Sequence, residues 1–246
     1  MFTFSDKRKD IPDGLWAKCD ECGEIVYSGE LSRNLGICSK CNYHFPLEPA
    51  DRIAILADEE SLVRSNVDGQ HVTCPDEEIC ERMIITGEAE LSGHQLVIAA
   101  VNIGSTGRDI GLFVCEGIVR AVNQAIDQRL PLLMIYTSSN GAQDSALFPA
   151  QTLSISAALS RLDKEKLLYI SVLAYSNSNS HFPGFACVAD VVVAESNIPA
   201  ARTNNQIDQA EAAQAVQTLF QNGMADMIVS RKDLKHTLTD VLSFFC

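Results

Sequence analysis

The sequence predicts an α/β protein with a small zinc-binding module at its N-terminus, and two observations support this. Two C-x-x-C pairs, at Cys19 and at Cys38, are separated by fifteen residues, which is the spacing of a four-thiolate zinc ribbon. After residue 50, apolar strands alternate with longer helical patterns, an order typical of parallel β-α units. We therefore expect a ribbon over 1–50 and a larger α/β domain over 51–246.

The composition indicates a soluble protein with one large core and a small accessory module. The chain has 246 residues, 46% of them hydrophobic and 21% charged. Its 32 acidic and 19 basic residues give a net charge of −13, which opposes binding to nucleic acid or to anionic membranes. No apolar run approaches the roughly 18 residues of a membrane span, and the charged start Met1–Asp10 is unlike a secretory signal. We expect a cytoplasmic protein whose cysteines are reduced rather than paired in a disulfide framework.

Four cysteines form the predicted metal site of the ribbon. A tetrahedral Zn²⁺ with four thiolate ligands has no open position for water, so the metal would be structural, with the ligands Cys19, Cys22, Cys38 and Cys41. Gly23 and Asn42 follow the two pairs, and both residue types tolerate the positive φ that such a turn needs. A chance grouping or two disulfides is the alternative. Residues 1–50 hold six basic and eight acidic residues, which argues against a nucleic-acid-binding ribbon.

The remaining elements follow from apolar periodicity and from glycine and proline positions. A short hairpin strand is expected within Glu24–Leu31, and a polar connector over 66–80. Strands are expected at 83–91, 96–101, 132–137, 168–174, 191–194 and 227–229, the first two joined by a turn at Gly93. Helices are expected at 49–58, 111–129, 145–162, 185–188, 210–221 and 234–245.

Three polar loops follow the expected strands and form the candidate site. Ligands of parallel α/β sheets bind at the carboxyl ends of the strands, which points to Gly104–Asp109, Ser138–Asp144 and Ser176–Gly184. His181 in the last loop is a candidate acid or base, with a solvated loop histidine as the alternative. The sequence has no Walker loop, no dinucleotide fingerprint and no catalytic metal motif.

Several segments along nearly the whole chain form a pattern that can be compared with known families. The ribbon has Gly14-Leu-Trp16 before it and His44 after it. The later segments are Asp51-Arg52-Ile53, Gly87–Gly93, Val119–Ala125, Pro131-Leu132, Ser156–Leu159, Tyr169–Leu173 and Gly223–Val229. In this order, the segments resemble the β subunit of bacterial acetyl-CoA carboxylase carboxyltransferase.

The resemblance implies a crotonase-like fold of stacked β-β-α units and a hetero-oligomer with an α subunit. It also implies transfer of a carboxyl group from biotin, on a biotin carboxyl carrier protein, to acetyl-CoA. The product, malonyl-CoA, supplies fatty acid or polyketide synthesis. The reaction passes through an enolate, and the family stabilises its oxygen with backbone N–H groups of paired glycines, where the absence of Cβ permits close approach.

This chain departs from the family's pattern in the site loops. Where the family has Ser-Gly-Gly-Ala-Arg, the sequence reads Ser139-Asn-Gly-Ala-Gln143, and the second paired glycine is replaced by Asn179-Ser180. Loss of one such donor typically lowers the rate by about 10²–10³. Asn140 can still adopt the left-handed conformation that most residues avoid.

Carried onto this sequence, the resemblance implies two groups of site residues. The oxyanion positions are Asn140, Gly141 and Ser180, and an acyl-CoA or acyl-carrier thioester would contact Gly107, Arg108 and Ala142. Arg108, Arg120 and Arg129 are candidates for CoA phosphates, with solvated helix faces as the alternative. Three functions stay open: a divergent carboxyltransferase, an inactive scaffold, regulatory or decoy subunit, and altered thioester chemistry such as decarboxylation.

Overall fold

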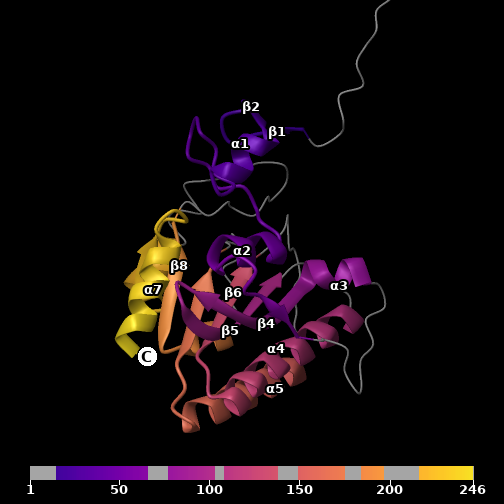
Figure 1. Cartoon of the computed structure of the whole chain (residues 1–246), viewed down its shortest axis with the longest axis vertical. Helices are drawn as coiled ribbons and strands as arrows, with labels where there is room; N and C mark the ends of the chain where they lie inside the picture. Colours follow the sequence, from indigo (N-terminus) through magenta and orange to yellow (C-terminus); the bar gives the residue numbers. More distant parts are fainter. Residues whose placement is uncertain are drawn as a thin grey trace, which may run out of the picture. The chain divides into compact units, whose positions relative to one another are not determined.

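The computed structural model describes residues 15–65, 77–102, 108–137, 149–174, 184–196 and 216–245. Contacts divide the chain into two compact units, Met1–Phe45 and Pro46–Cys246. Figure 1 shows the elements of both units.

The first unit is a small ribbon. Strands β1 (Trp16–Lys18) and β2 (Ile25–Tyr27) pair antiparallel, and helix α1 (Ser28–Arg33) follows directly. The short strand expected within Glu24–Leu31 is confirmed as β2, and the rest of that span belongs to α1. Glu30 in the first turn and Arg33 in the last complement the helix dipole and favour this helix.

The second unit contains a sheet that has seven strands within the described residues, in the order β3 to β9. The antiparallel part is β3 (Val63–Arg64), β4 (Ile84–Leu91) and β5 (His94–Asn102). Parallel pairing continues from β5 through β6 (Leu132–Thr137), β7 (Tyr169–Leu173), β8 (Val191–Glu195) and β9 (Met227–Val229). The predicted α/β class, the hairpin at Gly93 and the parallel strands are confirmed.

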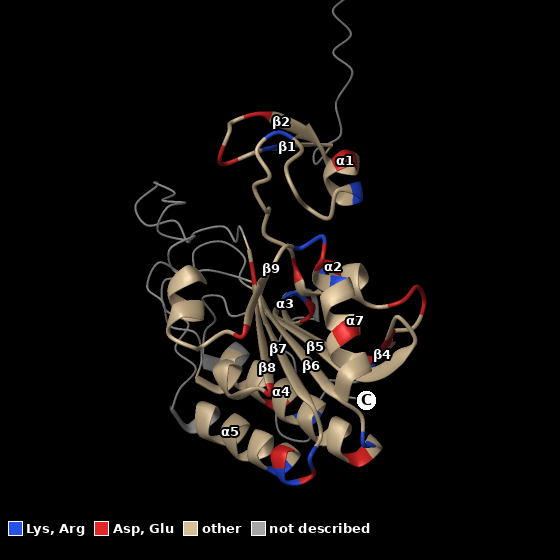
Figure 2. Ribbon diagram, turned by 90° about the vertical axis from the view of Figure 1, so that its left-hand side faces the viewer, with Lys and Arg blue, Asp and Glu red and all other residues tan. Residues whose placement is uncertain are grey.

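Helices cover both faces of this sheet (Figure 2). Helices α4 (Arg108–Gln128) and α5 (Pro149–Lys164) pack on one face, and α2 (Pro49–Leu56) and α7 (Leu234–Phe245) on the other. Alternate residues of β5 enter the two cores, and all six residues of β6 are buried. Near-continuous apolar strands such as β6 are expected when a parallel sheet is covered on both sides.

The structure also corrects the connector expected over 66–80, because helix α3 (Glu77–Met83) occupies its end. Its sequence, EEICERM, has few apolar residues, so the periodic signal is weak. Cys80 of this helix is buried and disulfide-bonded, whereas the described cysteines of the ribbon, Cys115 and Cys187 are free. The expectation of reduced thiols is therefore wrong at Cys80.

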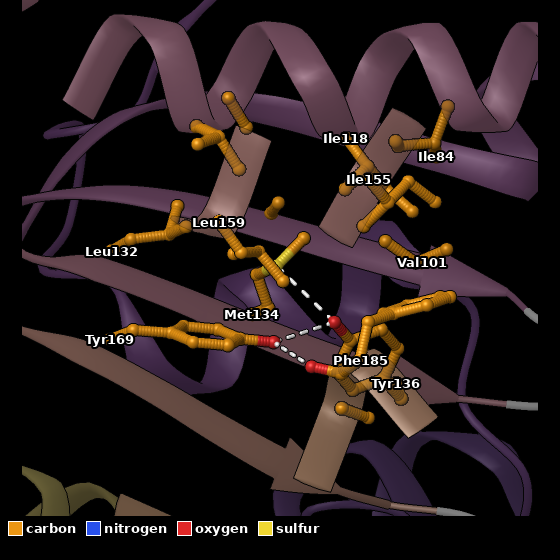
Figure 3. Close-up of a cluster of buried hydrophobic side chains, with 14 of the residues drawn as sticks. Ile84, Val101, Ile118, Leu132, Met134, Tyr136, Ile155, Leu159, Tyr169 and Phe185 are labelled. Atoms are coloured by element: carbon orange, nitrogen blue, oxygen red, sulfur yellow. Dashed lines mark hydrogen bonds between the residues drawn. The ribbon is translucent and has the colours of Figure 1, made fainter. Parts of the chain in front are cut away.

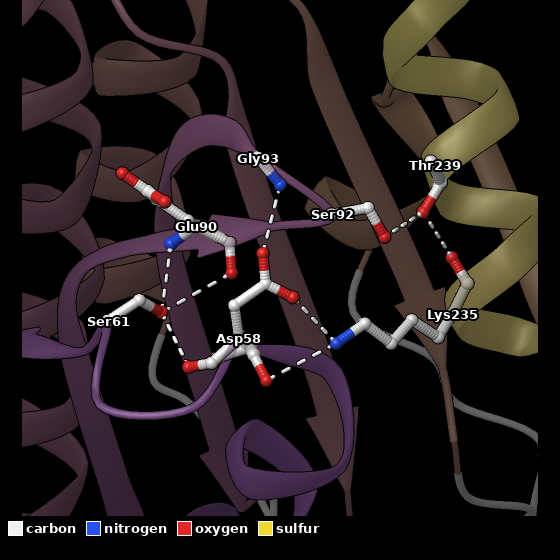
Figure 4. Close-up of polar contacts among 8 residues, drawn as sticks. Asp58, Ser61, Glu90, Ser92, Gly93, Lys235 and Thr239 are labelled. Atoms are coloured by element: carbon white, nitrogen blue, oxygen red, sulfur yellow. Dashed lines mark hydrogen bonds and ion pairs between the residues drawn. The ribbon is translucent and has the colours of Figure 1, made fainter.

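The C-terminal end of α2 is held at the amino edge of the sheet by a network around Asp58 (Figure 4). Asp58 accepts a hydrogen bond from the Gly93 N–H at 2.9 Å and pairs with Lys235 Nζ of α7 at 2.8 Å. These two partners, Lys235 first, lower the pKa of the Asp58 carboxyl from 3.8 to about 2. The network joins α2 and α7 to the β4–β5 turn.

Among the described residues, no helix is both long enough and apolar enough to cross a membrane.

Candidate functional site at the carboxyl edge of the sheet

The ribbon brings its four cysteines together. The Sγ atoms of Cys19, Cys22, Cys38 and Cys41 all lie within 4.8 Å of one another. Two of the separations, Cys19 to Cys41 and Cys22 to Cys38, are 3.6 and 3.9 Å. A tetrahedron of Zn–S bonds about 2.3 Å long places its sulfur atoms about 3.8 Å apart, whereas a disulfide needs about 2.05 Å. The four thiols therefore fit a tetrahedral zinc ion and not two disulfides.

The turns that carry the cysteines have the expected backbone. Gly23 and Asn42 have φ values of 71° and 61°, and their N–H groups donate to the Cys19 and Cys38 carbonyls at 2.9 and 3.0 Å. Burial raises the pKa of the Cys41 thiol to about 12 and also raises that of Cys19, whereas hydrogen bonds from the backbone of Cys41 and Lys40 outweigh burial and lower the pKa of Cys38. A divalent metal would favour the thiolate form of its ligands because it stabilises the anions directly. All four positions come from protein, which makes this a structural site.

The site loops predicted from the sequence leave the carboxyl edge of the second unit's sheet, where β5 to β8 end. Asn140, Gly141, Ala142, Ser180, His181 and Gly107 lie outside the described residues, and Arg108 is described only as the first residue of α4. Their roles stay predictions. The residues from which the loops start are described, and they form an ordered array.

Four strand ends lie in one row across this edge. Asn102 of β5 is in register with Thr137 of β6. The pairs Tyr136–Leu173 and Leu173–Ala194 place Ala174 and Glu195 one step further along their strands, in the same row.

Polar contacts from residues 47–52 and 82 reach every position of the row. The Leu47 carbonyl accepts a bond from Thr137 Oγ1 at 2.9 Å, and the Arg82 carbonyl accepts one from Asn102 Nδ2 at 3.3 Å. Arg52 Nη2 donates to the Ala174 carbonyl at 3.2 Å. The strand ends are therefore tied to the chain that enters and forms α2 and to the end of α3.

Glu195, the last residue of β8, is the centre of a buried ion cluster. It pairs with Arg52 Nη1 and with Arg231 Nε, the second at 2.7 Å. The exposed fractions of the Arg52, Glu195 and Arg231 side chains are 3%, 0% and 0%. Arg52 reaches the cluster because it lies on the same buried face of α2 as Ile53 and Leu56.

Sequence reasoning missed this cluster, although Asp51-Arg52-Ile53 was noted as part of the resemblance. The available signals were an arginine on the apolar face of a short helix and a glutamate that ends the apolar run Val191–Ala194. The pairing itself was hidden because Arg52 and Glu195 are 143 residues apart.

A second buried contact anchors the chain after the loop that contains Ser180 (Figure 3). The hydroxyls of Tyr136 and Tyr169 are 2.8 Å apart, and Tyr169 donates to the Phe185 carbonyl at 3.3 Å. Burial raises the pKa of Tyr169, which keeps this hydroxyl a neutral donor. Phe185 belongs to the short helix η1 (Gly184–Val188), so η1 is tied to β6 and β7.

Two arginines considered for CoA phosphates have other surroundings. Arg129 follows α4 near the start of β6, at the amino edge, and pairs with Glu165 at 3.2 Å while 66% exposed. Arg120 lies 3.8 Å from Glu116 on the same helix. Arg129 therefore matches the alternative of a solvated arginine, because the candidate site lies at the opposite edge of the sheet.

Comparison with known proteins identifies the ribbon and the whole chain. Residues 16–41 match the family model described as the acetyl-CoA carboxylase zinc finger domain. The acetyl-coenzyme A carboxylase carboxyl transferase subunit beta of Desulforamulus reducens is 33% identical over 98% of this chain and 91% of its own length. The protein of the same name from Brevibacillus brevis is 33% identical over 96% of this chain and 82% of its own length.

Solved structures share the fold at low identity. The β subunit of P. aeruginosa geranyl-CoA carboxylase has a TM-score of 0.56 at 17% identity, covering 80% of this chain and 42% of that one. Transcarboxylase 12S has a TM-score of 0.54 at 13% identity, covering 87% of this chain and 44% of that one. The predicted crotonase-like α/β fold with an N-terminal zinc ribbon is confirmed. The chain belongs to the family of acetyl-CoA carboxylase carboxyl transferase β subunits.

Proposed function

We propose that this chain is a divergent carboxyltransferase β subunit, which works with an α subunit in the cytoplasm. Together they transfer a carboxyl group from biotin on its carrier protein to acetyl-CoA, giving malonyl-CoA. The observation that carries the proposal is the 33% identity to a carboxyltransferase β subunit over 98% of the chain. The row of anchored strand ends supports it, because this fold binds ligands at that edge.

The reaction sets a clear demand on the site loops. Acetyl-CoA loses a proton from its methyl carbon, the enolate carbon bonds to the carboxyl carbon, the bond from that carbon to the biotin nitrogen breaks, and the released nitrogen takes up the proton. Negative charge develops on the thioester oxygen and needs N–H donors aimed at it. In this proposal the donors are backbone N–H groups at Asn140, Gly141 and Ser180, and the thioester contacts Gly107, Arg108 and Ala142. Asn140 and Ser180 retain a backbone N–H, so the chemistry depends on their conformation.

A reconstitution assay tests this proposal. The chain is co-expressed with the carboxyltransferase α subunit of the same genome, and malonyl-CoA is converted to acetyl-CoA with biocytin as carboxyl acceptor. We expect turnover that needs both subunits. The double variant Asn140→Gly, Ser180→Gly should be faster, by up to about 10²-fold for each restored donor. Absence of turnover by the native complex would contradict the proposal, and activity of the double variant in the same assay would show that the assay itself works.

The replaced glycines favour one second candidate, an inactive subunit that keeps the fold and the partner as a scaffold, regulator or decoy. It predicts a stable complex with the α subunit and no turnover in either direction. The same assay separates the two functions, because co-purification and turnover are measured on one sample. Acetyl-CoA formed from malonyl-CoA without biocytin would instead indicate decarboxylation.

We also propose that the ribbon holds Zn²⁺ through Cys19, Cys22, Cys38 and Cys41. The metal stabilises a unit whose core is small, since buried residues other than cysteine are few around it. Metal analysis of the purified chain should find about one zinc per chain, released by a strong chelator. Cys22→Ser should lower the zinc content, whereas Cys115→Ser, in the sheet unit, should leave it unchanged.

A further inference from the structure

We propose that the contacts at the carboxyl edge act as a positioning device for the site loops. We call this set the carboxyl-edge brace; its members are Leu47, Arg52, Arg82, Asn102, Thr137, Ala174, Glu195 and Arg231. Its catalytic consequence rests on the proposed carboxyltransferase function. The structural consequence, fixed starting points for the loops, can be tested separately.

The first step of the argument is geometric. Thr137 and Ala174 are adjacent in the register row, and they immediately precede the two segments that contain the predicted oxyanion residues. The segment 47–52 bonds to both through the Leu47 carbonyl and the Arg52 guanidinium. A single stretch of chain therefore fixes the starting points of both loops relative to each other.

The second step concerns the guanidinium of Arg52. Its Nη1 pairs with Glu195 of β8, and its Nη2 bonds the Ala174 carbonyl at the end of β7. The planar fork of arginine holds two acceptors in a fixed geometry, which the point charge of lysine does not. Glu195 has a second partner in Arg231 Nε, which follows β9. The cluster thus links α2 with the ends of β7 and β8 and with the chain after β9.

The third step is energetic. The free energy needed to remove charges from water offsets much of the electrostatic attraction between them. A buried ion cluster is therefore weak evidence for stability. Arg52 Nε is buried and has no hydrogen-bond partner within the described part of the chain, which adds to that cost. Apolar residues would fill this space with no such penalty. A geometric role at the site edge accounts for the charges better than stability does.

The last step connects position to rate. Donors to a developing oxyanion act only when they are held close to the productive geometry, and a misplacement of about 1 Å can lower the rate about 10²-fold. Loss of the brace should affect the transition state more than the binding of the thioester. The expected signature is a fall in kcat with little change in KM.

The experiment compares Arg52→Met and Arg52→Lys with the control Lys235→Met in the complex with the α subunit. In the described part of the chain, the Lys235 ammonium bonds Asp58 and the Ala57 carbonyl, just after α2, rather than a member of the brace. The readouts are kcat and KM for malonyl-CoA, the thermal midpoint, and amide hydrogen exchange of peptides over 138–148 and 175–183. We expect Arg52→Met to lower kcat about 10²-fold with KM within about threefold, and to speed exchange in both peptides. Arg52→Lys should recover only part of the kcat, and Lys235→Met should lower the midpoint without changing kcat or exchange.

The outcomes separate the two proposals. If the native complex has no turnover, the proposed function fails, and hydrogen exchange alone decides the brace. Unchanged exchange in both loops of Arg52→Met overturns the brace, and so does an unchanged kcat in an active complex. If Arg52→Met does not fold, Thr137→Val is used, which removes one hydrogen bond to Leu47 and should speed exchange over 138–148. Unchanged exchange in that variant also overturns the brace.

Discussion

The two ends of helix α2 carry the same kind of ion pair in different surroundings. At the carboxyl edge, Arg52 and Glu195 are 3% and 0% exposed. At the amino edge, Lys235 and Asp58 are 37% and 31% exposed. Water screens the second pair, whereas the buried charges depend on each other. One short helix is therefore held by a buried ion cluster at the site edge and by a partly exposed ion pair at the opposite edge.

The segments joined at each end differ as well. The buried end contacts Ala174, from which one site loop continues, and Glu195 at the neighbouring strand end. The exposed end contacts the β4–β5 turn, where Gly93 has a φ of 81°, and α7. Changes at the buried end should therefore affect both the stability of the fold and the position of the site loops. Changes at the exposed end should affect only stability.

The largest expected effect comes from removing the central charge of the buried cluster. Glu195→Gln removes the carboxylate that Arg52 and Arg231 share, and breaking a buried ion pair typically destabilises a protein by about 3–5 kcal/mol. Urea unfolding of the isolated chain measures the change. A loss below about 1 kcal/mol, the value typical of an exposed pair, would remove the distinction between the two ends.

An intermediate effect is expected at the buried tyrosine pair. Tyr169→Phe leaves the Phe185 carbonyl without this donor and removes the contact with the Tyr136 hydroxyl. An unsatisfied buried group costs about 1–3 kcal/mol, so thermal unfolding should show a loss in this range. Ser156→Ala is the control, because among the described residues its hydroxyl bonds the Thr152 carbonyl alone, at an exposed position of α5, and the variant should stay within about 0.5 kcal/mol of the native chain. Equal losses in both variants would show that burial of the hydroxyl has no special importance here.

The sequence predicted these regions unequally, for physical reasons. Periodicity located the strands of the parallel sheet and the turn at Gly93, because apolar burial on two faces leaves a strong local pattern. It missed α3, whose apolar residues are few. The spacing of Cys19 to Cys41 predicted the metal ligands because all four lie within one short segment. The ion cluster was not predictable, since Arg52 and Glu195 meet only in the tertiary structure.

A small effect is expected at the exposed end of α2. Asp58→Asn removes the charge that pairs with Lys235 but retains an oxygen that can accept the Gly93 N–H. Half-exposed pairs contribute about 0.2–1 kcal/mol, so the variant should lose less than 1 kcal/mol in urea unfolding at pH 7. A loss of about 3 kcal/mol or more would place this pair in the same class as the buried one.

The smallest expected effect is the pH dependence of the stability that Asp58→Asn loses. Its sign follows from the lowered pKa of Asp58. The Lys235 ammonium and the Gly93 N–H lower the pKa of Asp58 from 3.8 to about 2, so the folded state binds the proton less readily than the unfolded state. The charged pair therefore stabilises the fold fully above pH 3.8, and its contribution is lost as the pH falls through the folded pKa. The stability difference between the native chain and Asp58→Asn should be equal at pH 7 and pH 5.5 and smaller at pH 3. A difference that grows on acidification would contradict this sign, and with it the assignment of Asp58 as the charged partner of Lys235.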